Sequence, residues 1–353
     1  MAIWISGISG AINMEQRGEV AMSSDPQGFP KIGPPVVLSG QPTPCFLVTV
    51  DTEEEFDWSA PFSRSGHGVT HLSSIEPFQQ LCERFGVTPV YLVDYPVAQD
   101  GFGAEFFAGL VGSGVAEVGL QLHPWVTPPF DEEVNVHNSY ACNLAPDLER
   151  TKLFRLFEIV EKKLGCQPDS YRAGRYGAGT HTPAFLAELG IRVDTSVRSL
   201  FDYRQQGGPN YARCPLTPYW VQPGSLLELP VTSLFGGLFR SMGPLLFDQV
   251  FGSETMRSAL ARSGMLERIA LTPEGIPADK AIEAIDLAID DGLPVLTFSF
   301  HSPSLAVGHT PYVRTEQQLE LFYSWWEQVF THLQKRSVKP SSIADITAAA
   351  FPK

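Results

Sequence analysis

The stretch "CFLVTVDTEEEFDW", residues 45–58, runs from apolar and β-branched residues into a group of acidic ones that begins at Asp51. A short apolar run of this kind is typical of a buried strand. The period of two in an extended chain places Asp51 and Glu53 on the same side of that strand. Two carboxylates in a confined place repel each other unless a cation or an arginine lies between them, or one holds a proton. The stretch therefore predicts a functional site at the end of a buried strand.

Similar strand-like runs recur along the chain, in the segments "TPVYLVD" 88–94, "AEVGLQLH" 116–123, "SYRAG" 170–174, "IRVDTSV" 191–197, "LLELPVT" 226–232 and "PVLTFSFH" 294–301. Helical spacing lies between most of them, at 75–86, 147–165, 181–190 and 278–292, and each of these segments closes on a glycine. This alternation predicts parallel strands joined by crossover helices. Seven strands of this kind favour an α/β barrel.

The domain organisation follows from the same pattern. Residues 1–44 show no sustained period and become rich in Pro, Gly and Ser, so we expect an irregular leader. We expect the barrel at 45–340, with 233–275 as an insertion between the sixth and seventh strands, and a C-terminal tail at 341–353. The segment 322–336 has the spacing of an amphipathic barrel helix.

Composition restricts the possible partners and location. The formal net charge of -14 gives no basic surface for nucleic acid, and no apolar run is long enough to cross a bilayer. The five cysteines are widely spaced without a Cys-x-x-Cys pair, which favours buried thiols in a reducing compartment. We expect a cytoplasmic protein without nucleic acid partners or a membrane span, and the sequence leaves the oligomeric state open.

Polar residues stand at the carboxyl ends of five predicted strands: Asp51, His123, Arg172, Asp194 and His301. One such residue by itself would more often be a helix cap or a core histidine. In α/β barrels, however, catalytic side chains gather at this rim, because the strand end fixes them and the following loop admits substrate. Their joint placement predicts an active site.

The residue types suggest metal-assisted chemistry. Gln121 and His123 share a face of the third strand, and a carboxylate with a neutral imidazole is ordinary ligation for zinc or a similar divalent ion. Arg172 and Arg175 could clamp a carboxylate through paired hydrogen bonds.

His301 follows a buried run and can donate a proton to a leaving group, with a neighbouring carboxylate such as Asp194 orienting it. Phe298 and Phe300 beside it would form apolar walls that suit a small group such as a methyl. Together these residues could assist the attack of water on an acyl carbon.

Five segments in this order resemble the motifs of the polysaccharide deacetylase family, also called the NodB-homology domain or carbohydrate esterase family 4. They are "TVDTEEEFDW" 49–58, "EVGLQLHPWVTPPF" 117–130, "YRAGRYG" 171–177, "LGIRVDTSV" 189–197 and "LTFSFHSPSL" 296–305. The chain looks closest to the WalW-like branch. The resemblance implies a distorted (β/α)₇ barrel that removes acetyl groups from N-acetylated sugars of a polysaccharide, glycolipid or glycoside, using a divalent metal such as zinc.

The resemblance also implies roles for single residues. Asp51 matches the base, Arg172 the arginine that holds it, Asp194 the fourth-motif aspartate and His301 the acid. Where the family has its metal-binding carboxylate this chain has Thr52, and Glu53 is the natural substitute. The predicted substrate contacts are Trp125, Arg175, Tyr176 and Phe300.

The second motif departs from the family's His-x-x-x-His pattern, because Gln121 stands first and Trp125 last, with His123 between them. Three interpretations stay open. The metal is held by Glu53 and His123 with help from Gln121, water or a residue such as His137; or the site works without metal; or catalysis has been lost.

Three functions therefore compete: a carbohydrate deacetylase, a metal-independent amidohydrolase like the allantoinase-like branch, and a non-catalytic carbohydrate-binding barrel. Retention of both a base and an acid argues against the third. We expect Glu54 and Glu55 to face solvent or to pair with Arg172 or Arg175. We expect His71 to lie on the surface or in a loop.

Overall fold

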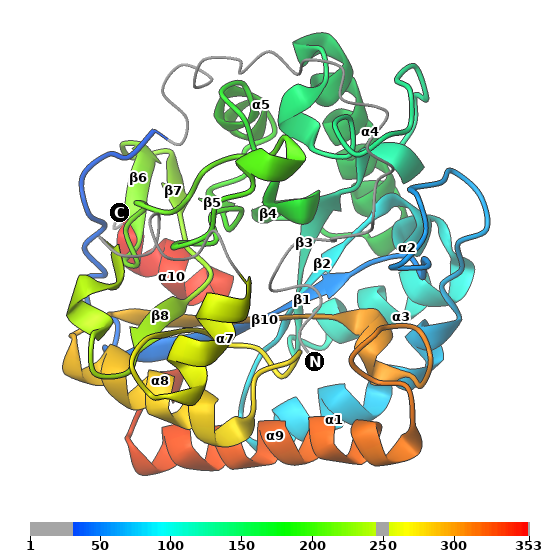
Figure 1. Ribbon diagram of the computed structural model, residues 1–353. Helices are drawn as coiled ribbons and strands as arrows, with labels where there is room; N and C mark the ends of the chain where they lie inside the picture. Colours follow the sequence, from blue (N-terminus) through cyan, green and yellow to red (C-terminus); the bar gives the residue numbers. More distant parts are fainter. Residues whose placement is uncertain (1–30, 245–253, 352–353) are drawn as a thin grey trace, which may run out of the picture.

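A computed structural model describes residues 31–244 and 254–351. Its centre is a curled sheet in the order β10-β1-β2-β3-β4-β5-β7-β6, with β11 also paired to β1 (Figure 1). The strands in this sheet are β1 Cys45–Thr52, β2 Val90–Val93, β3 Glu117–Leu122, β4 Ser170–Ala173, β5 Val193–Asp194, β6 Tyr219–Gln222, β7 Leu226–Glu228, β10 Val295–His301 and β11 Lys339–Pro340. All pairs are parallel except β6 with β7. The predicted α/β barrel class is confirmed as a curled half-barrel.

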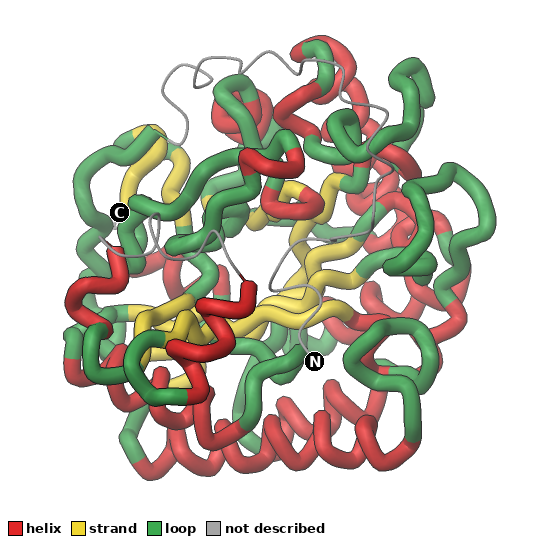
Figure 2. Tube along the Cα trace, in the orientation of Figure 1, coloured by secondary structure: helices red, strands yellow, loops and turns green. Residues whose placement is uncertain are grey.

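All seven predicted strands are present, and helices occupy the segments predicted to be helical. These helices are α1 Glu76–Arg84, α4 Pro146–Leu164, α5 Thr182–Glu188, α8 Ala278–Asp290 and α9 Glu316–Lys335. The four glycines expected to end α1, α4, α5 and α8 all have positive φ, as a left-handed helix end requires. In Figure 2 the helices lie around the outside of the strands.

Two helices between β2 and β3 were not predicted, α2 Tyr95–Gln99 and α3 Gly101–Gly112. Glycines within α3 lower its helix propensity, and its apolar residues are not confined to one face. Side-chain caps begin both helices instead: Asp94 accepts a hydrogen bond from the Val97 N–H and Asp100 from the Gly103 N–H.

The two faces of β10 divide the core from the barrel interior. Phe298 and Phe300 pack against Trp326 of α9, on the helix side of the sheet. Ser299 and His301 alternate with them and face the interior, which is lined by polar side chains. This alternation places the polar residues of several strands in one enclosed space.

The predicted insertion contributes a small second sheet of β8 Ser233–Gly236 and β9 Glu267–Ala270, with helix α7 Glu254–Arg262 between them. Backbone hydrogen bonds tie it to β10: the Thr232 N–H donates to the Thr297 carbonyl, and the Ser299 N–H donates to the Leu271 carbonyl. The insertion thus lies against β10, at the open edge of the half-barrel.

The segment expected as a C-terminal tail contains helix α10 Ile343–Ala350, which starts with a capping box formed by Ser342 and Asp345. Ile343 and Ile346 pack in a core cluster with Leu47 of β1. Residues 1–30 of the predicted leader lie outside the described residues, and the domain boundaries stay a prediction. No helix in the described part of the chain is long and apolar enough to cross a membrane.

Candidate active site

Asp51 lies at the end of β1 and is buried against Arg172 of β4. Arg172 Nη1 donates to the Asp51 carboxylate and also to Ser299 Oγ, at 2.9 Å. The remaining donors of this guanidinium are used by Thr49 Oγ1, at 2.8 Å, and by the carbonyl and hydroxyl of Thr195. Arg172 is therefore fixed by residues of β1 and β10 and by Thr195, which follows β5, and it holds Asp51 in one orientation.

His301 is the register partner of Asp51 on the neighbouring strand β10. Its Nε2 atom lies 3.8 Å from Asp51 Oδ2, and its Nδ1 atom lies 2.7 Å from Glu274 Oε2. Burial would lower the pKa of His301, but the charges of Glu274, Glu53 and Asp51 outweigh it and raise that pKa to about 10. At neutral pH the ring is an imidazolium with one N–H on Glu274 and the other beside Asp51.

The prediction that Asp194 orients His301 is wrong, because Glu274 has that position. The Asp194 carboxylate accepts from the N–H and hydroxyl of Ser196, and burial raises its pKa to about 6. Glu274 comes from the loop after β9, where its other oxygen accepts from the His301 N–H. Glu274 lies outside the predicted strands and the five motif segments, so the sequence pattern did not predict its contact with His301.

The predicted metal residues Glu53, Gln121 and His123 come together. Gln121 Nε2 donates to Glu53 Oε2 at 3.2 Å, and His123 Nε2 lies 3.5 Å from the same oxygen. Glu53 Oε1 and Gln121 Oε1 are buried and have no hydrogen-bond partner among the described residues. Two orphaned oxygens beside an imidazole nitrogen form a donor set that suits a divalent cation.

Glu54 is fully buried, so the expectation that it faces solvent or pairs with an arginine is wrong. Its carboxylate accepts from His123 Nδ1 at 2.8 Å and from Trp125 Nε1 at 2.7 Å. The extended conformation ends at Thr52, so the period of two does not continue into the acidic group. Burial lowers the pKa of His123 to about 4. The neutral ring donates through Nδ1 and presents the Nε2 lone pair to Glu53.

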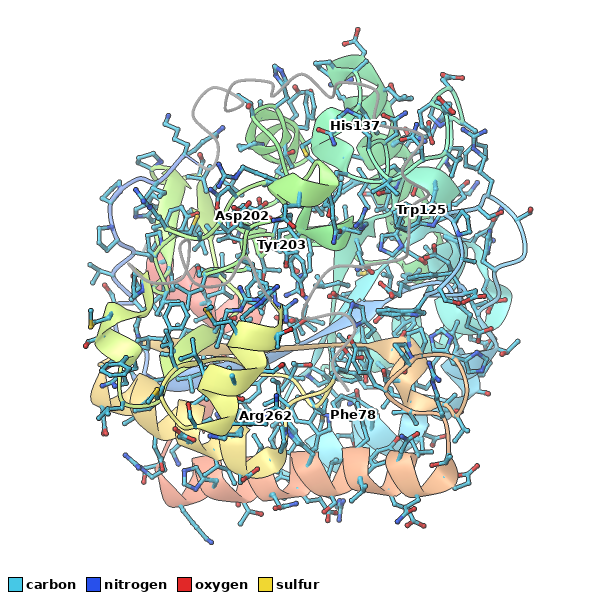
Figure 3. All side chains as sticks on the ribbon, viewed as in Figure 1. Phe78, Trp125, His137, Asp202, Tyr203 and Arg262 are labelled. Carbon is cyan, nitrogen blue, oxygen red and sulfur yellow. The ribbon has the colours of Figure 1, made fainter. Side chains whose placement is uncertain are left out.

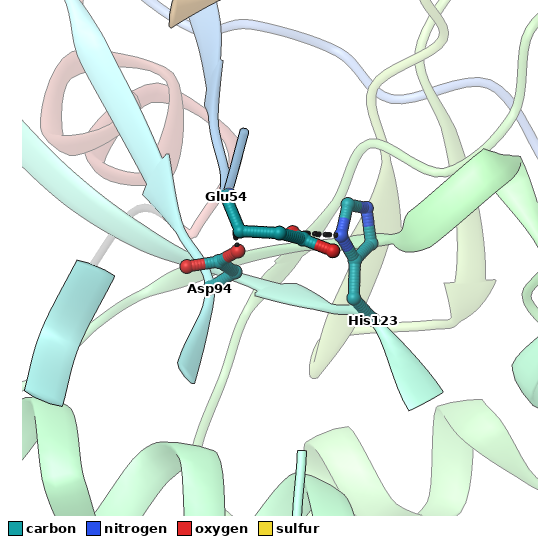
Figure 4. A group of neighbouring side chains, drawn as sticks. All are labelled: Glu54, Asp94 and His123. Atoms are coloured by element: carbon teal, nitrogen blue, oxygen red, sulfur yellow. Dashed lines mark hydrogen bonds and ion pairs between the residues drawn. The ribbon is translucent and has the colours of Figure 1, made fainter. Parts of the chain in front are cut away.

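A second possible metal group consists of Glu54, Asp94 and His123, which offer ligand atoms within 4.8 Å of one another (Figure 4). These atoms are already used, since His123 Nδ1 donates to Glu54 and Asp94 accepts from the Glu54 and Val97 N–H groups. Coordination by His123 Nδ1 would remove the proton that this atom donates to Glu54, and an ion there would compete with the N–H groups for the Asp94 oxygens. The group of Glu53, Gln121 and His123 Nε2 fits a metal better.

A further chain of polar contacts links Glu55, His71 and Ser302. Glu55 Oε1 lies 3.0 Å from His71 Nδ1, and His71 Nε2 lies 2.8 Å from Ser302 Oγ. The order is that of a serine hydrolase triad, but Ser302 is 0% exposed, so its hydroxyl does not reach a substrate in this arrangement. The expectation that His71 lies on the surface or in a loop is wrong, because it is buried in the short 3-10 helix Thr70–Ser74. Glu55 pairs with histidine rather than arginine.

Gly174 allows the end of β4 to approach the second motif closely. A Cβ on Gly174 would lie 2.2 Å from His123 Cδ2 and 2.6 Å from the Leu122 carbonyl oxygen. The two residues after it, Arg175 and Tyr176, both have positive φ, at 54° and 60°. This turn carries the side chains of Arg175 and Tyr176 to the rim of the site.

The predicted substrate contacts have different surroundings. The Tyr176 ring lies 5.8 Å from the Arg172 guanidinium. Arg175 is half-buried over the ring of Tyr140, at 4.1 Å. Trp125 is 3% exposed and stacks on His123, with ring centroids 4.3 Å apart, so its indole supports the histidine.

Phe300 is 0% exposed and contacts Phe78 and Trp326 on the helix side of β10. The prediction that it contacts substrate is therefore wrong, because strand alternation turns it away from His301. His137, considered as an extra metal residue, lies apart from Trp125 in Figure 3, and its carbonyl accepts from Asn143.

No family model matches the sequence, and no curated protein matches it. Among solved structures, PuuE allantoinase has 14% identity and a TM-score of 0.50, with 89% of this chain and 96% of that chain covered. A provisionally assigned polysaccharide deacetylase from Mycobacterium smegmatis has 18% identity and a TM-score of 0.46, covering 89% and 98%. The chitin deacetylase of Colletotrichum lindemuthianum has 12% identity and a TM-score of 0.44, covering 89% and 92%. The first similarity shows a shared fold.

The arrangement provides a carboxylate and an imidazolium that face one another at the mouth of a barrel. The carboxylate is fixed by an arginine, and the imidazolium is fixed by a second carboxylate. A base and an acid within reach of one small group can move a proton from an attacking water to a leaving atom. This is the chemistry of acyl hydrolysis.

Proposed function

We propose that the protein is a hydrolase that removes the acetyl group from an N-acetylated sugar unit, with Asp51 as base and His301 as acid. The observation that carries the proposal is the register pairing of these residues, with His301 Nε2 and Asp51 Oδ2 3.8 Å apart. Names of similar solved structures, such as chitin deacetylase, agree with this activity. If the protein is cytoplasmic, as the cysteines favour, a biosynthetic precursor is a more suitable substrate than an assembled polymer.

The proposed reaction uses each partner once. Asp51 accepts a proton from the attacking water, whose oxygen forms a bond to the acetyl carbonyl carbon. Arg172 holds the Asp51 carboxylate in one orientation for this step. His301 then gives its Nε2 proton to the sugar nitrogen, the C–N bond breaks, and acetate and the free amine leave. Glu274 stabilises the imidazolium before transfer and sets its orientation.

A divalent ion would be held by Glu53, by His123 Nε2 and by Gln121 Oε1. When bound, such an ion lowers the pKa of a coordinated water and polarises the carbonyl. A donor set with two oxygens and one nitrogen suits zinc and also manganese, because an amide oxygen is a better ligand for harder cations. Glu54 would act on the ion through His123, by fixing which ring nitrogen is free.

A second candidate is metal-independent hydrolysis of a cyclic or linear amide by Asp51, Arg172 and His301. Two observations favour it: the second motif supplies one histidine in place of two, and the fold is shared with an allantoinase. In this case a proton shared by Glu53 and His123 would replace the ion, since burial raises the pKa of Glu53 well above its usual range.

The test is acetate release from a panel of N-acetylated sugars, measured with added zinc or manganese and after treatment with a chelator. We expect Asp51→Asn to lower kcat by about a hundredfold or more. Asp57→Asn is the matched control, because this exposed aspartate lies in the same segment. Full activity in Asp51→Asn would refute the assigned base, and activity unaffected by chelation would favour the metal-independent reaction.

A further inference from the structure

A cluster of arginines lies beside the proposed active site. This arginine cluster consists of Arg198, from the loop after β5, Arg268 of β9 and Arg257 of α7. The guanidinium carbons of Arg198 and Arg268 lie 4.0 Å and 3.4 Å from the centre of the same Phe201 ring. Because both guanidinium groups contact the same ring, the two positive charges lie close to each other. Burial lowers the pKa of Arg268 to about 9, and the charges of Arg198 and Arg257 add to this effect.

Arg268 donates to the Leu200 carbonyl, whereas Arg198 and Arg257 have no carboxylate partner in the part of the chain that the structure describes. The ion pairs of residues 31–244 and 254–351 do not include Arg198 or Arg257. The Nε atoms of both residues are buried and have no hydrogen-bond partner there. The protein has 39 acidic residues against 25 basic ones, so acidic partners are abundant elsewhere. Like charges placed together repel each other unless an anion lies between them.

Aromatic stacking does not fully account for the cluster. A guanidinium stacked on a ring uses its flat face and leaves the N–H groups around its edge available to acceptors. Burial would lower the pKa of Arg198, but Tyr176 and Tyr203 lie beside it and favour its charged form, so that pKa is raised. The buried Nε groups of Arg198 and Arg257, which have no hydrogen-bond partner among the described residues, indicate a site for a ligand with anionic oxygens.

The cluster is connected to the proposed active site through Tyr176. The Tyr176 ring lies 5.4 Å from the Arg198 guanidinium and 5.8 Å from that of Arg172, which holds Asp51. Tyr203 stacks on Tyr176 with ring centroids 5.9 Å apart (Tyr203 is labelled in Figure 3). The arginine cluster and the pair of Asp51 and Arg172 are therefore separated by a single tyrosine ring, a span that one sugar with a substituent can bridge.

We propose that the arginine cluster is a subsite for a phosphate or carboxylate carried by the substrate. This inference rests on the proposed deacetylase function and specifies its substrate class, an N-acetylated sugar with an anionic substituent. Arg198 supplies edge N–H groups to the anionic oxygens, while Arg257 and Arg268 contribute positive charge. The insertion thereby selects the substrate, because it supplies two of the three arginines.

The first experiment compares N-acetylglucosamine with N-acetylglucosamine 6-phosphate and N-acetylmuramic acid as substrates for acetate release. We expect a KM at least about tenfold lower for an anionic sugar than for the neutral one, the size of one charged hydrogen bond. Arg198→Gln and, separately, Arg257→Gln should move this KM ratio toward one. Arg262→Gln is the control, because this exposed arginine lies on the same helix α7 as Arg257 (Figure 3). Equal KM values for all three sugars in the wild type would overturn the proposal.

A second experiment separates the subsite from catalysis. Calorimetric titration of the wild-type protein with inorganic phosphate should detect binding that Arg198→Gln weakens about tenfold and Arg262→Gln leaves intact. Phosphate binding without acetate release from any sugar would support the anionic subsite and refute the proposed deacetylase function. Acetate release from the neutral sugar without phosphate binding would support the deacetylase function and refute the anionic subsite. Thermal melts of each variant check that it is folded.

Discussion

The Glu54 carboxylate accepts a hydrogen bond from His123 Nδ1 at 2.8 Å, and this contact determines which nitrogen of His123 faces Glu53. Glu54 stands next to Glu53 in sequence, yet the two side chains meet opposite sides of the same imidazole. Glu54 fixes the ring through Nδ1, and Glu53 lies beside Nε2, the nitrogen that is left free for a ligand.

Replacing Glu54 by Gln should weaken metal binding. The amide removes the charge behind His123 and allows the other tautomer, which would present an N–H to Glu53. We expect a loss of about 10- to 100-fold in the affinity for zinc or manganese, measured by calorimetry. Glu133→Gln, an exposed change on a neighbouring loop, is the control. Equal affinity in the two variants would contradict the role of Glu54.

The pH dependence should reflect the contact between Glu274 and His301. The acid must be protonated, and its pKa is about 10, so activity should persist through neutral pH and fall as the pH rises through 10. Because this pKa is raised in the folded protein, the contact also stabilises the fold below the usual histidine pKa, and this stabilisation is lost as the pH rises through 10. Glu274→Gln removes the largest favourable charge and should move the alkaline limb of kcat to lower pH. An unchanged limb would show that another group is the acid.

Removal of Arg172 should destabilise the protein. Arg172→Met leaves the Asp51 carboxylate buried without its cation, and breaking a buried pair in this way typically costs about 3 to 5 kcal/mol. Denaturant unfolding measures this loss. The double variant with Asp51→Asn should recover part of it, because the uncompensated charge is gone. A double variant no more stable than Arg172→Met would argue that packing alone explains the effect.

Gly174→Ala should displace His123, since a Cβ there would lie 2.2 Å from His123 Cδ2 and 2.6 Å from a backbone oxygen. Metal affinity and acetate release should both fall. Gly109→Ala is the matched control: its added Cβ meets nothing within 4 Å, and in helix α3 it should raise stability by up to about 1 kcal/mol. Comparable activity in the two alanine variants would refute the close contact.

The sequence predicted what depends on local periodicity. The end of each strand could be located from its apolar run, so Asp51, Arg172 and His301 were correctly placed together, and Gln121 and His123 fell on one face as expected. Phe300 is next to His301 in sequence but points to the opposite face of β10, because side chains alternate along a strand.

The contacts of Glu54 and Glu274 could not be predicted in the same way. Glu54 follows the point where the extended conformation stops, so no period fixed its direction. Glu274 approaches His301 from a segment 27 residues earlier in the chain, and only the tertiary fold brings the two together. Acidic residues are frequent in this protein, and nothing in its local sequence distinguishes Glu274 from the others.

The segment that lies against the open edge of the half-barrel reaches the site from two directions. Its last loop supplies Glu274, which pairs with His301, and β9 and α7 supply two arginines of the cluster. A chimera in which this segment, residues 233–275, is exchanged should therefore change both the pKa of His301 and the preference for charged substrates. The strands that carry Asp51 and Arg172 would be unchanged.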